Sequence, residues 1–263
     1  MQNGIENFKI KKQVNNRLVE KIDTIAIEEP LEIQIKREGK KPKAISVTMR
    51  TPGDDQELAF GFLFTEGVLK SYTDVNAVSY DGDNIIKIHV AADFDLPTNS
   101  LERNFYTTSS CGVCGKASID AIYTKSVFNV IAGTKITKKV LFSLKDKLVR
   151  EQSLFTKTGG IHAAALFSMD GNLESVFEDV GRHNALDKLV GNAFKTSKLP
   201  FCNKILLLSG RASFELIQKA TMAGISNIVA VGAPSSLAVK LAKQNGQTLI
   251  GFLKESSFNI YAS

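Results

Sequence analysis

The stretch KILLLSGRASFELIQKATMAGISNIVAVGAP, residues 204–234, predicts a buried strand, a helix and a second buried strand. Its two apolar runs, over 204–208 and 227–231, end in glycine and small polar residues, which is typical of strands buried on both faces of a parallel sheet. The pattern between them is helical over 213–223. This order of elements predicts a parallel sheet that is covered by helices.

The same alternation extends in both directions along the chain. The other elements expected in this part are helices over 143–155, 182–193 and 235–245 and strands over 163–167, 173–178 and 248–252. The spacing favours an α/β region with helices on both faces of the sheet. Ligands of such sheets bind just beyond the carboxyl ends of the strands.

The N-terminal part has a different pattern. Residues 1–50 alternate apolar and polar side chains, as half-buried strands do, and further strands are expected over 75–80 and 84–90. A helix is expected in the stretch TPGDDQELAFGFLFTEGVL, with Asp54 as its N-cap and Glu57 completing a capping box. We therefore divide the chain into a β-rich region over 1–101, a loop and linker over 102–142 and an α/β region over 143–263.

Composition excludes several classes of protein. The 263 residues include 43% hydrophobic and 23% charged side chains, which is ordinary for a globular protein. Three cysteines cannot build a disulfide scaffold, and the start of the chain lacks the apolar segment of a secretory signal. No apolar run approaches the ~18 residues of a membrane helix. We expect a cytoplasmic protein that binds neither membrane nor, for lack of basic runs with interleaved aromatics, nucleic acid.

The strongest chemical signal is SSCGVCGK, which contains Cys111 and Cys114. Such a pair can ligate a metal, act as a redox couple or provide a nucleophile with a helper. Zinc needs three or four ligands, and the chain has no second CxxC. The surrounding segment, 102–157, carries 10 basic and 4 acidic side chains, a net charge of +6, and such a field stabilises a thiolate. A thiolate on a glycine-flanked loop suits a carrier of sulfane sulfur.

A second motif, TGGIHAAAL, contains His162. Cytidine-deaminase-like enzymes have a related His-x-Glu motif, in which the glutamate shuttles protons beside zinc. Here Ala164 stands at the glutamate position, and the CxxC precedes the histidine. Deamination is therefore disfavoured, and a structural hydrogen bond is the preferred role of His162.

Three turns at strand ends suit an anion. Arg182 and His183 begin a helix after Gly181, Ser209 and Arg211 follow the next strand, and Ser235 precedes a further helix. Backbone N–H groups at helix starts and arginine side chains both attract phosphate. The turns together predict a phosphate-bearing ligand. In the alternative interpretation, Arg182 pairs with Glu178 or Asp179 as part of the framework.

The blocks SSCGVCGK, TGGIHAAAL, EDVGRHNALDKLVG, LLLSGRASFELIQKA and GAPSSLAVKLA occur in this order, and together they resemble the formate dehydrogenase accessory sulfurtransferase (FdhD) family. The resemblance implies a cytidine-deaminase-like three-layer fold and a homodimer. It implies a cytoplasmic sulfurtransferase that takes sulfur from a cysteine desulfurase and passes it to the molybdenum cofactor, Mo-bis(molybdopterin guanine dinucleotide), before this enters formate dehydrogenase.

The resemblance also assigns residues. Cys111 matches the persulfide cysteine of the family, with Cys114 as its neighbour. The stretch that the family uses at the cofactor matches Phe252, Leu253, Lys254, Glu255, Ser256 and Ser257. The cofactor is then a bound substrate, and no structural metal is expected. Cys202, at the start of a strand, should be a small buried hydrophobe.

Two other functions stay open at this point. In one, the protein is a non-catalytic chaperone that holds the molybdenum cofactor and docks on formate dehydrogenase. In the other, it is a zinc-dependent hydrolase. The alanine at position 164, where the catalytic glutamate would stand, disfavours this function.

Overall fold

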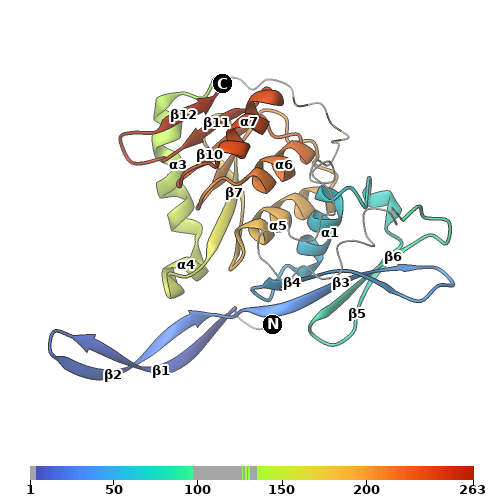
Figure 1. Cartoon of the computed structure of the whole chain (residues 1–263), viewed down its shortest axis with the longest axis horizontal. Coiled ribbons are helices and arrows are strands. Elements are labelled where there is room, and N and C mark those ends of the chain that lie inside the picture. Colours follow the sequence, from blue (N-terminus) through green and yellow to red (C-terminus); the bar gives the residue numbers. More distant parts are fainter. Residues whose placement is uncertain (1–3, 97–125, 127, 129, 131–134) are drawn as a thin grey trace.

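A six-stranded sheet forms the centre of the C-terminal part. The structure is a computed structural model that describes residues 4–96, 126, 128, 130 and 135–263. The sheet has the strand order β12-β11-β10-β9-β7-β8 (Figure 1). Its strands are β7 (His162–Ser168), β8 (Leu173–Asp179), β9 (Lys204–Leu208), β10 (Asn227–Ala230), β11 (Thr248–Gly251) and β12 (Asn259–Ala262).

The expectation of a parallel sheet holds for its centre only. Strands β9, β10 and β11 are parallel, whereas β7 is antiparallel to both β8 and β9, and β12 is antiparallel to β11. The outer pairs are antiparallel because short turns join β7 to β8 and β11 to β12, and a short turn reverses the chain direction. The central strands are joined instead through helices.

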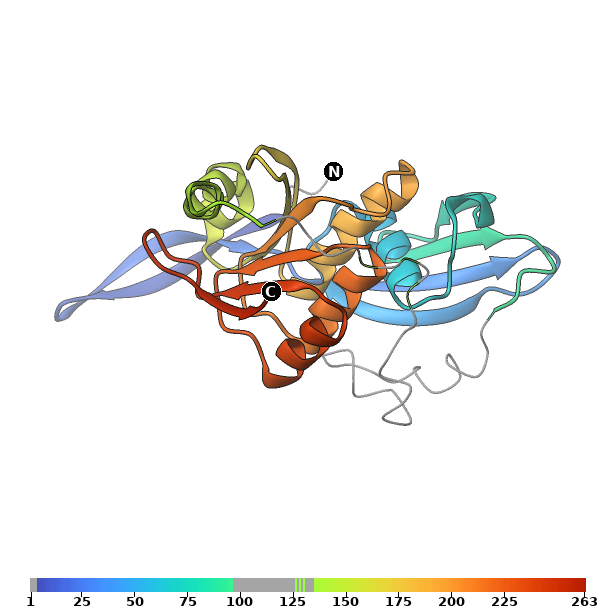
Figure 2. The same cartoon turned by 90° about the horizontal axis from the view of Figure 1, so that it is seen from above.

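Helices cover both faces of this sheet, as the sequence predicts (Figures 1 and 2). Alternate residues of β9 enter two separate apolar clusters. Leu206 and Leu208 pack in the cluster that contains the helices α5, α6 and α7, whereas Ile205 and Leu207 pack in the cluster of α3. The helices of this region are α3 (Lys138–Glu151), α4 (Ser153–Thr158), α5 (Arg182–Lys195), α6 (Phe214–Met222) and α7 (Ser236–Gln244).

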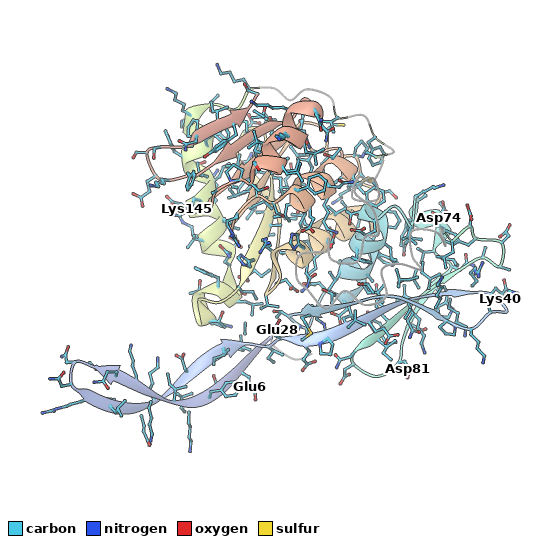
Figure 3. The ribbon with its side chains drawn as sticks, viewed as in Figure 1. Glu6, Glu28, Lys40, Asp74, Asp81 and Lys145 are labelled. Atoms are coloured by element: carbon cyan, nitrogen blue, oxygen red, sulfur yellow. The ribbon has the colours of Figure 1, made fainter. Side chains whose placement is uncertain are left out.

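The N-terminal part contributes two more sheets and a helix. A four-stranded sheet has the order β4-β3-β6-β5. Among the described residues β1 pairs only with β2, in a hairpin that extends away from the rest of the molecule (Figures 1 and 3). The elements are β1 (Ile5–Val14), β2 (Arg17–Ala26), β3 (Glu29–Arg37), β4 (Lys43–Arg50), α1 (Asp55–Thr65), the 3-10 turn Tyr72–Asp74, β5 (Ala77–Tyr80) and β6 (Ile85–Val90). The β-rich N-terminal part and the mixed α/β class are therefore confirmed.

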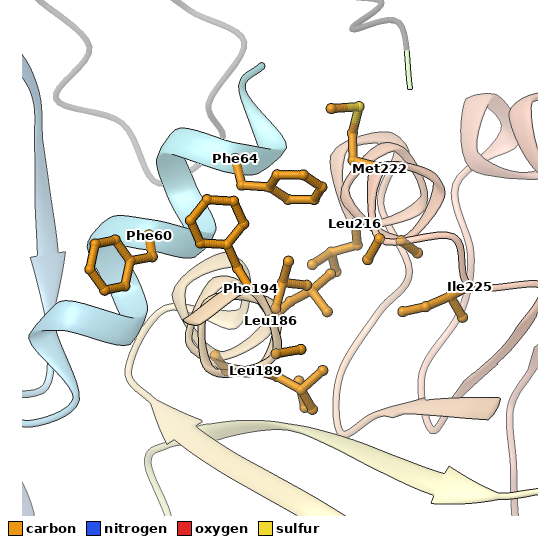
Figure 4. Packing of buried hydrophobic residues seen from close by; sticks show 14 of the residues in the cluster. Phe60, Phe64, Leu186, Leu189, Phe194, Leu216, Met222 and Ile225 are labelled. Atoms are coloured by element: carbon orange, nitrogen blue, oxygen red, sulfur yellow. The ribbon is translucent and has the colours of Figure 1, made fainter. Parts of the chain in front are cut away.

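Helices α1 and α5 pack at very short range, and this contact joins the two parts of the chain. A Cβ atom added to Gly61 of α1 would lie 1.8 Å from the carbonyl oxygen of Asp187, and one added to Gly191 of α5 would lie 1.8 Å from that of Glu57. Only glycine permits such an approach of two backbones. Around the crossing, Phe64 and Phe194 lie with ring centroids 5.3 Å apart (Figure 4).

Several details differ from the sequence predictions. Asp54 precedes α1 in the left-handed region (φ 56°), and its side chain makes no capping hydrogen bond. Glu57 does not complete a capping box, because its carboxylate pairs with Lys195 at 3.1 Å. The predicted helix over 143–155 is two helices: Thr137 caps α3, which begins ahead of the expected boundary at 143, and Gln152 (φ −80°, ψ 81°) interrupts it.

Cys202 is a further correction. It is exposed rather than buried, because it lies in the turn before β9, where its backbone N–H donates to the carbonyl of Pro200. Strand β12 is an addition that the sequence pattern did not predict. Within the described ranges, no helix is long and apolar enough to cross a membrane.

Candidate functional site

The carboxyl ends of β8, β9, β10 and β11 lie at one edge of the large sheet, together with the beginning of β7. His162, the first residue of β7, pairs with Asp179 at the end of β8. On its other side, the N–H of Ala163 donates to the Oγ of Ser209 at 2.8 Å. A Cβ on Gly210 would lie 3.2 Å from the His162 ring, so this ring stands directly against the turn after β9.

Backbone hydrogen bonds join the next turns into the same edge. The N–H of Ala212 donates to the carbonyl of Ala233 at 3.1 Å, and the N–H of Ser235 donates to that of Ala212 at 2.9 Å. The N–H of Phe252 donates to the carbonyl of Gly232 at 3.1 Å. The turns that follow β9, β10 and β11 are thus held side by side, and they bring the predicted residues 209–211, 235 and 252–257 to one edge.

Positive charge gathers around His162. Burial lowers the pKa of its imidazole below the ordinary 6.5, and the electrostatic effect of the nearby Arg182, His183 and Arg211 lowers it further. The ring is therefore neutral at physiological pH. The sequence indicated a structural role for His162, but it did not predict that His162 lies close to Arg182 and Arg211.

Arg182 does not pair with either of its neighbouring carboxylates. Glu178 accepts hydrogen bonds from the backbone of Leu154 and Phe155. Asp179 forms a fully buried ion pair with Lys188 at 2.8 Å. The Nε of Arg182 is buried and has no hydrogen-bond partner among the residues that the structure describes. The framework interpretation of Arg182 is therefore wrong, and its Nε is an unsatisfied donor at this edge of the sheet.

Three other predicted side chains have internal hydrogen bonds. The Nε2 of His183 lies 2.9 Å from Glu215 and 3.1 Å from the hydroxyl of Ser213, which holds the beginning of α6 against α5. The Oγ of Ser235 accepts the N–H of Ala238 at 3.2 Å as the cap of α7. Ser209 accepts the N–H of Ala163. The two serine hydroxyls keep a proton to donate, whereas His183 serves mainly to position α6.

The beginnings of three helices face this edge. Helices α5, α6 and α7 each start within a few residues of a strand end, and neither α5 nor α6 has a side-chain cap. Uncapped N–H groups and the helix dipole favour an anion there. Arg211 is exposed beside them and adds a charge that a ligand can reach.

The turn after β11 is anchored by one buried residue, and the rest of it is exposed. Leu253 is buried, and its N–H donates to the carbonyl of Ala230 at 3.2 Å. The N–H of Lys254 donates to the carbonyl of Ser257 at 2.8 Å, which closes the turn. The exposed residues of this stretch are Phe252, Lys254, Glu255, Ser256 and Ser257. Their side chains can therefore contact a ligand at the sheet edge.

Cys111 and Cys114 lie outside the described residues, so their position relative to this edge stays a prediction. Within the described residues, no group of three or more His, Cys, Asp or Glu side chains is arranged to hold a metal ion. Neither the zinc alternative nor the expected absence of a structural metal is tested by this observation.

Known proteins similar to the chain agree on one family. A model described as the FdhD/NarQ family matches residues 26–263. A Streptomyces coelicolor protein named sulfur carrier protein FdhD is 52% identical over 91% of this chain and 87% of its own length. One of the same name from Sulfurisphaera tokodaii is 42% identical over 98% and 96%. A crystal structure from Desulfotalea psychrophila, described as a candidate formate dehydrogenase accessory protein, has the same fold, with a TM-score of 0.74 and 22% identity over 98% and 97% of the two chains.

Proposed function

This chain belongs to the FdhD/NarQ family, and on that basis we propose that it is a cytoplasmic sulfur carrier for formate dehydrogenase. In this proposal Cys111 takes sulfur from a cysteine desulfurase and holds it as a persulfide. The sulfur then passes to Mo-bis(molybdopterin guanine dinucleotide), which is bound as a substrate at the sheet edge. The names of the curated relatives support sulfur carriage, and the unpaired Nε of the partly exposed Arg182 side chain supports an anionic ligand at this edge.

The loading step is a thiol exchange. The thiolate of Cys111 attacks the outer sulfur of the desulfurase persulfide. One S–S bond forms as another breaks, and the desulfurase cysteine leaves as a thiolate. The step needs no external oxidant or reductant, and its rate depends on the fraction of thiolate. The net charge of +6 over residues 102–157 favours that form.

The delivery step needs two electrons, because the sulfane sulfur must leave as sulfide. The thiolate of Cys114 supplies them when it attacks the inner sulfur of the Cys111 persulfide. Sulfide is released toward the molybdenum, and a Cys111–Cys114 disulfide forms. A cellular dithiol then reduces this disulfide. In this scheme Cys111 is the carrier, and Cys114 is the reductant.

The guanine nucleotide tails of the cofactor provide the phosphates. Their pyrophosphate groups fit the uncapped starts of α5 and α6 and the guanidinium groups of Arg182 and Arg211. The turn over 252–257 lies beside the turn after β10 at the same edge, and its exposed residues would contact the outer part of the ligand.

Intact-mass measurement tests the carrier function. The purified protein is incubated with a cysteine desulfurase and cysteine, and the expected product is a sulfur adduct that dithiothreitol removes. Cys111→Ala should abolish the adduct. Cys202→Ser is the matched control, because Cys202 is an exposed thiol that lies in the turn before β9 and is assigned no part in sulfur transfer.

The same experiment separates the carrier from a chaperone without sulfur chemistry. If wild-type protein gains no sulfur, or if Cys111→Ala restores full formate dehydrogenase activity to a strain that lacks the wild type, the carrier proposal is wrong. The chaperone alternative would then account for the family's link to formate dehydrogenase.

A further inference from the structure

The side-chain amide of Asn184, in the first turn of α5, makes three hydrogen bonds outside its own helix. Its Nδ2 donates to the carbonyl of Met49 at 2.7 Å and to Oδ1 of Asp179 at 3.0 Å, and its Oδ1 accepts the hydroxyl of Thr48 at 3.1 Å. Thr48 and Met49 lie on β4, in the N-terminal part of the chain. Asn184 is only 7% exposed, so a lost partner would leave a buried polar group unsatisfied. The amide therefore fixes the beginning of α5 to β4.

Asp179 is the second support of this turn. Its Oδ1 also accepts the backbone N–H of Gly181, the residue before α5, at 2.8 Å, and its Oδ2 accepts the N–H of Thr51 at 3.1 Å. A carboxylate close to an anion site would repel the anion. The ion pair with Lys188 offsets this charge. Asp179 can therefore hold the turn without opposing an anionic ligand.

Gly181 packs directly against both supports. A Cβ atom there would lie 2.9 Å from Nδ2 of Asn184 and 3.4 Å from Oδ1 of Asp179. The φ angle of Gly181 is −93°, which any residue adopts, so the need for glycine is one of space. This close contact leaves the turn little room to shift.

The turn that is held in this way begins the candidate ligand site. Arg182 and His183 lie between Gly181 and Asn184, so the backbone is fixed on both sides of them. No side chain caps α5, and its first N–H groups remain for an anion. Arg182 is partly exposed, and its Nε has no hydrogen-bond partner among the described residues. The direction of its guanidinium therefore depends on the turn that carries it.

We propose that Asn184 is a positioning residue of the ligand site, which through β4 keeps the first turn of α5 and the guanidinium of Arg182 in place for a phosphate group. The inference rests on the proposed function, because it concerns the phosphate end of the same site. Hydrogen bonds weaken steeply when the donor is misaligned, so a small rotation of the turn would reduce affinity. The N-terminal part of the chain thus contributes to a site that its own residues do not line.

Calorimetric titration with guanosine diphosphate, which carries a pyrophosphate like that of the cofactor tails, measures the effect of each contact. Asn184→Ala should raise the dissociation constant about tenfold, and Thr48→Val, which removes one of the three hydrogen bonds, about threefold. Thr48→Ser keeps the hydroxyl and should bind within about twofold of wild type. Gly181→Ala should resemble Asn184→Ala, because its Cβ would displace the amide.

A double-mutant cycle separates positioning from general damage to the fold. In the Arg182→Ala chain, Asn184→Ala should weaken binding by no more than about threefold, because the guanidinium that it positions is gone. A merely structural role would cause the same loss in both chains. Thr196→Val is the matched control, since it removes a hydroxyl that donates to the carbonyl of Asn192 at 2.8 Å at the other end of α5. It should leave the dissociation constant unchanged.

The possible results distinguish the inference from the proposed function. If wild-type protein does not bind guanosine diphosphate at millimolar concentration, the phosphate site fails and the inference fails with it. If wild type binds and the folded Asn184→Ala and Thr48→Val variants bind equally well, only the inference is overturned. Equal losses in the wild-type and Arg182→Ala chains would overturn it as well. The urea midpoint shows which variants are folded, and if Asn184→Ala is not, Thr48→Val takes its place in the cycle.

Discussion

Replacing Arg182 by alanine should weaken the binding of guanosine diphosphate, which mimics half of the cofactor's tail, by about ten- to a hundredfold. The Nε of this side chain is buried without a described partner, so water competes poorly for it. A hydrogen bond between a charged donor and phosphate contributes about 1.5–3 kcal/mol, which corresponds to that factor. Arg211 is exposed, and a surface ion pair contributes about 0–1 kcal/mol, or at most about fivefold.

Calorimetric titration at fixed salt measures this difference. Arg182→Lys should bind with intermediate affinity, since it keeps the charge but loses the planar fork of donors. Cys111→Ala should bind as wild type does, because the thiol is assigned to the molybdenum end of the ligand. The urea midpoint of each variant shows whether it is folded. If Arg182→Ala is folded and binds with wild-type affinity, or if Arg211→Ala loses more, the buried donor does not bind phosphate.

Two further predictions concern stability. Gly191→Ala should lower the free energy of unfolding by about 2 kcal/mol, because its Cβ would meet the carbonyl oxygen of Glu57. Overpacking costs about 1–3 kcal/mol or more, whereas the higher helix propensity of alanine returns up to about 1 kcal/mol. Urea unfolding measures this loss, with Gly160→Ala as the control, because a Cβ there would come no closer than 3.9 Å to another atom. Because the pKa of His162 is lowered from 6.5 in the folded state, the unfolded chain binds its proton first, and stability should fall as the pH drops below about 6.5. His162→Gln should lose that part of the decline, and an unchanged pH profile would contradict the reasoning.

The alternation of strands and helices from 163 to 252 was predictable because each element has a clear period and a glycine or polar residue at its end. Strand β9 has the predicted bounds. Strand β12 was not predictable, because Asn259–Ala262 is short and its Ile260 is exposed. The interruption at Gln152 was missed as well, since the apolar pattern continues across it.

The strand-end turns of the candidate site were predictable from local sequence, whereas the state of each side chain was not. The hydrogen bonds of His183 depend on Ser213 and Glu215, which lie on a different helix. The place of His162 beside Gly210 depends on β7 being antiparallel to β9, and single-strand patterns do not contain the direction of pairing.

The close crossing of α1 and α5 also constrains how the protein is made. Gly61 leaves the ribosome long before Gly191, and at about 5–20 residues per second the delay is on the order of ten seconds. During this time the side of α1 that packs against α5 has no partner, although Phe60 can already pack on Tyr72. The N-terminal sheet can therefore begin to fold early, but its helix is secured only when most of the chain has been synthesised. The early chain is thus a natural client for chaperones that hold nascent proteins.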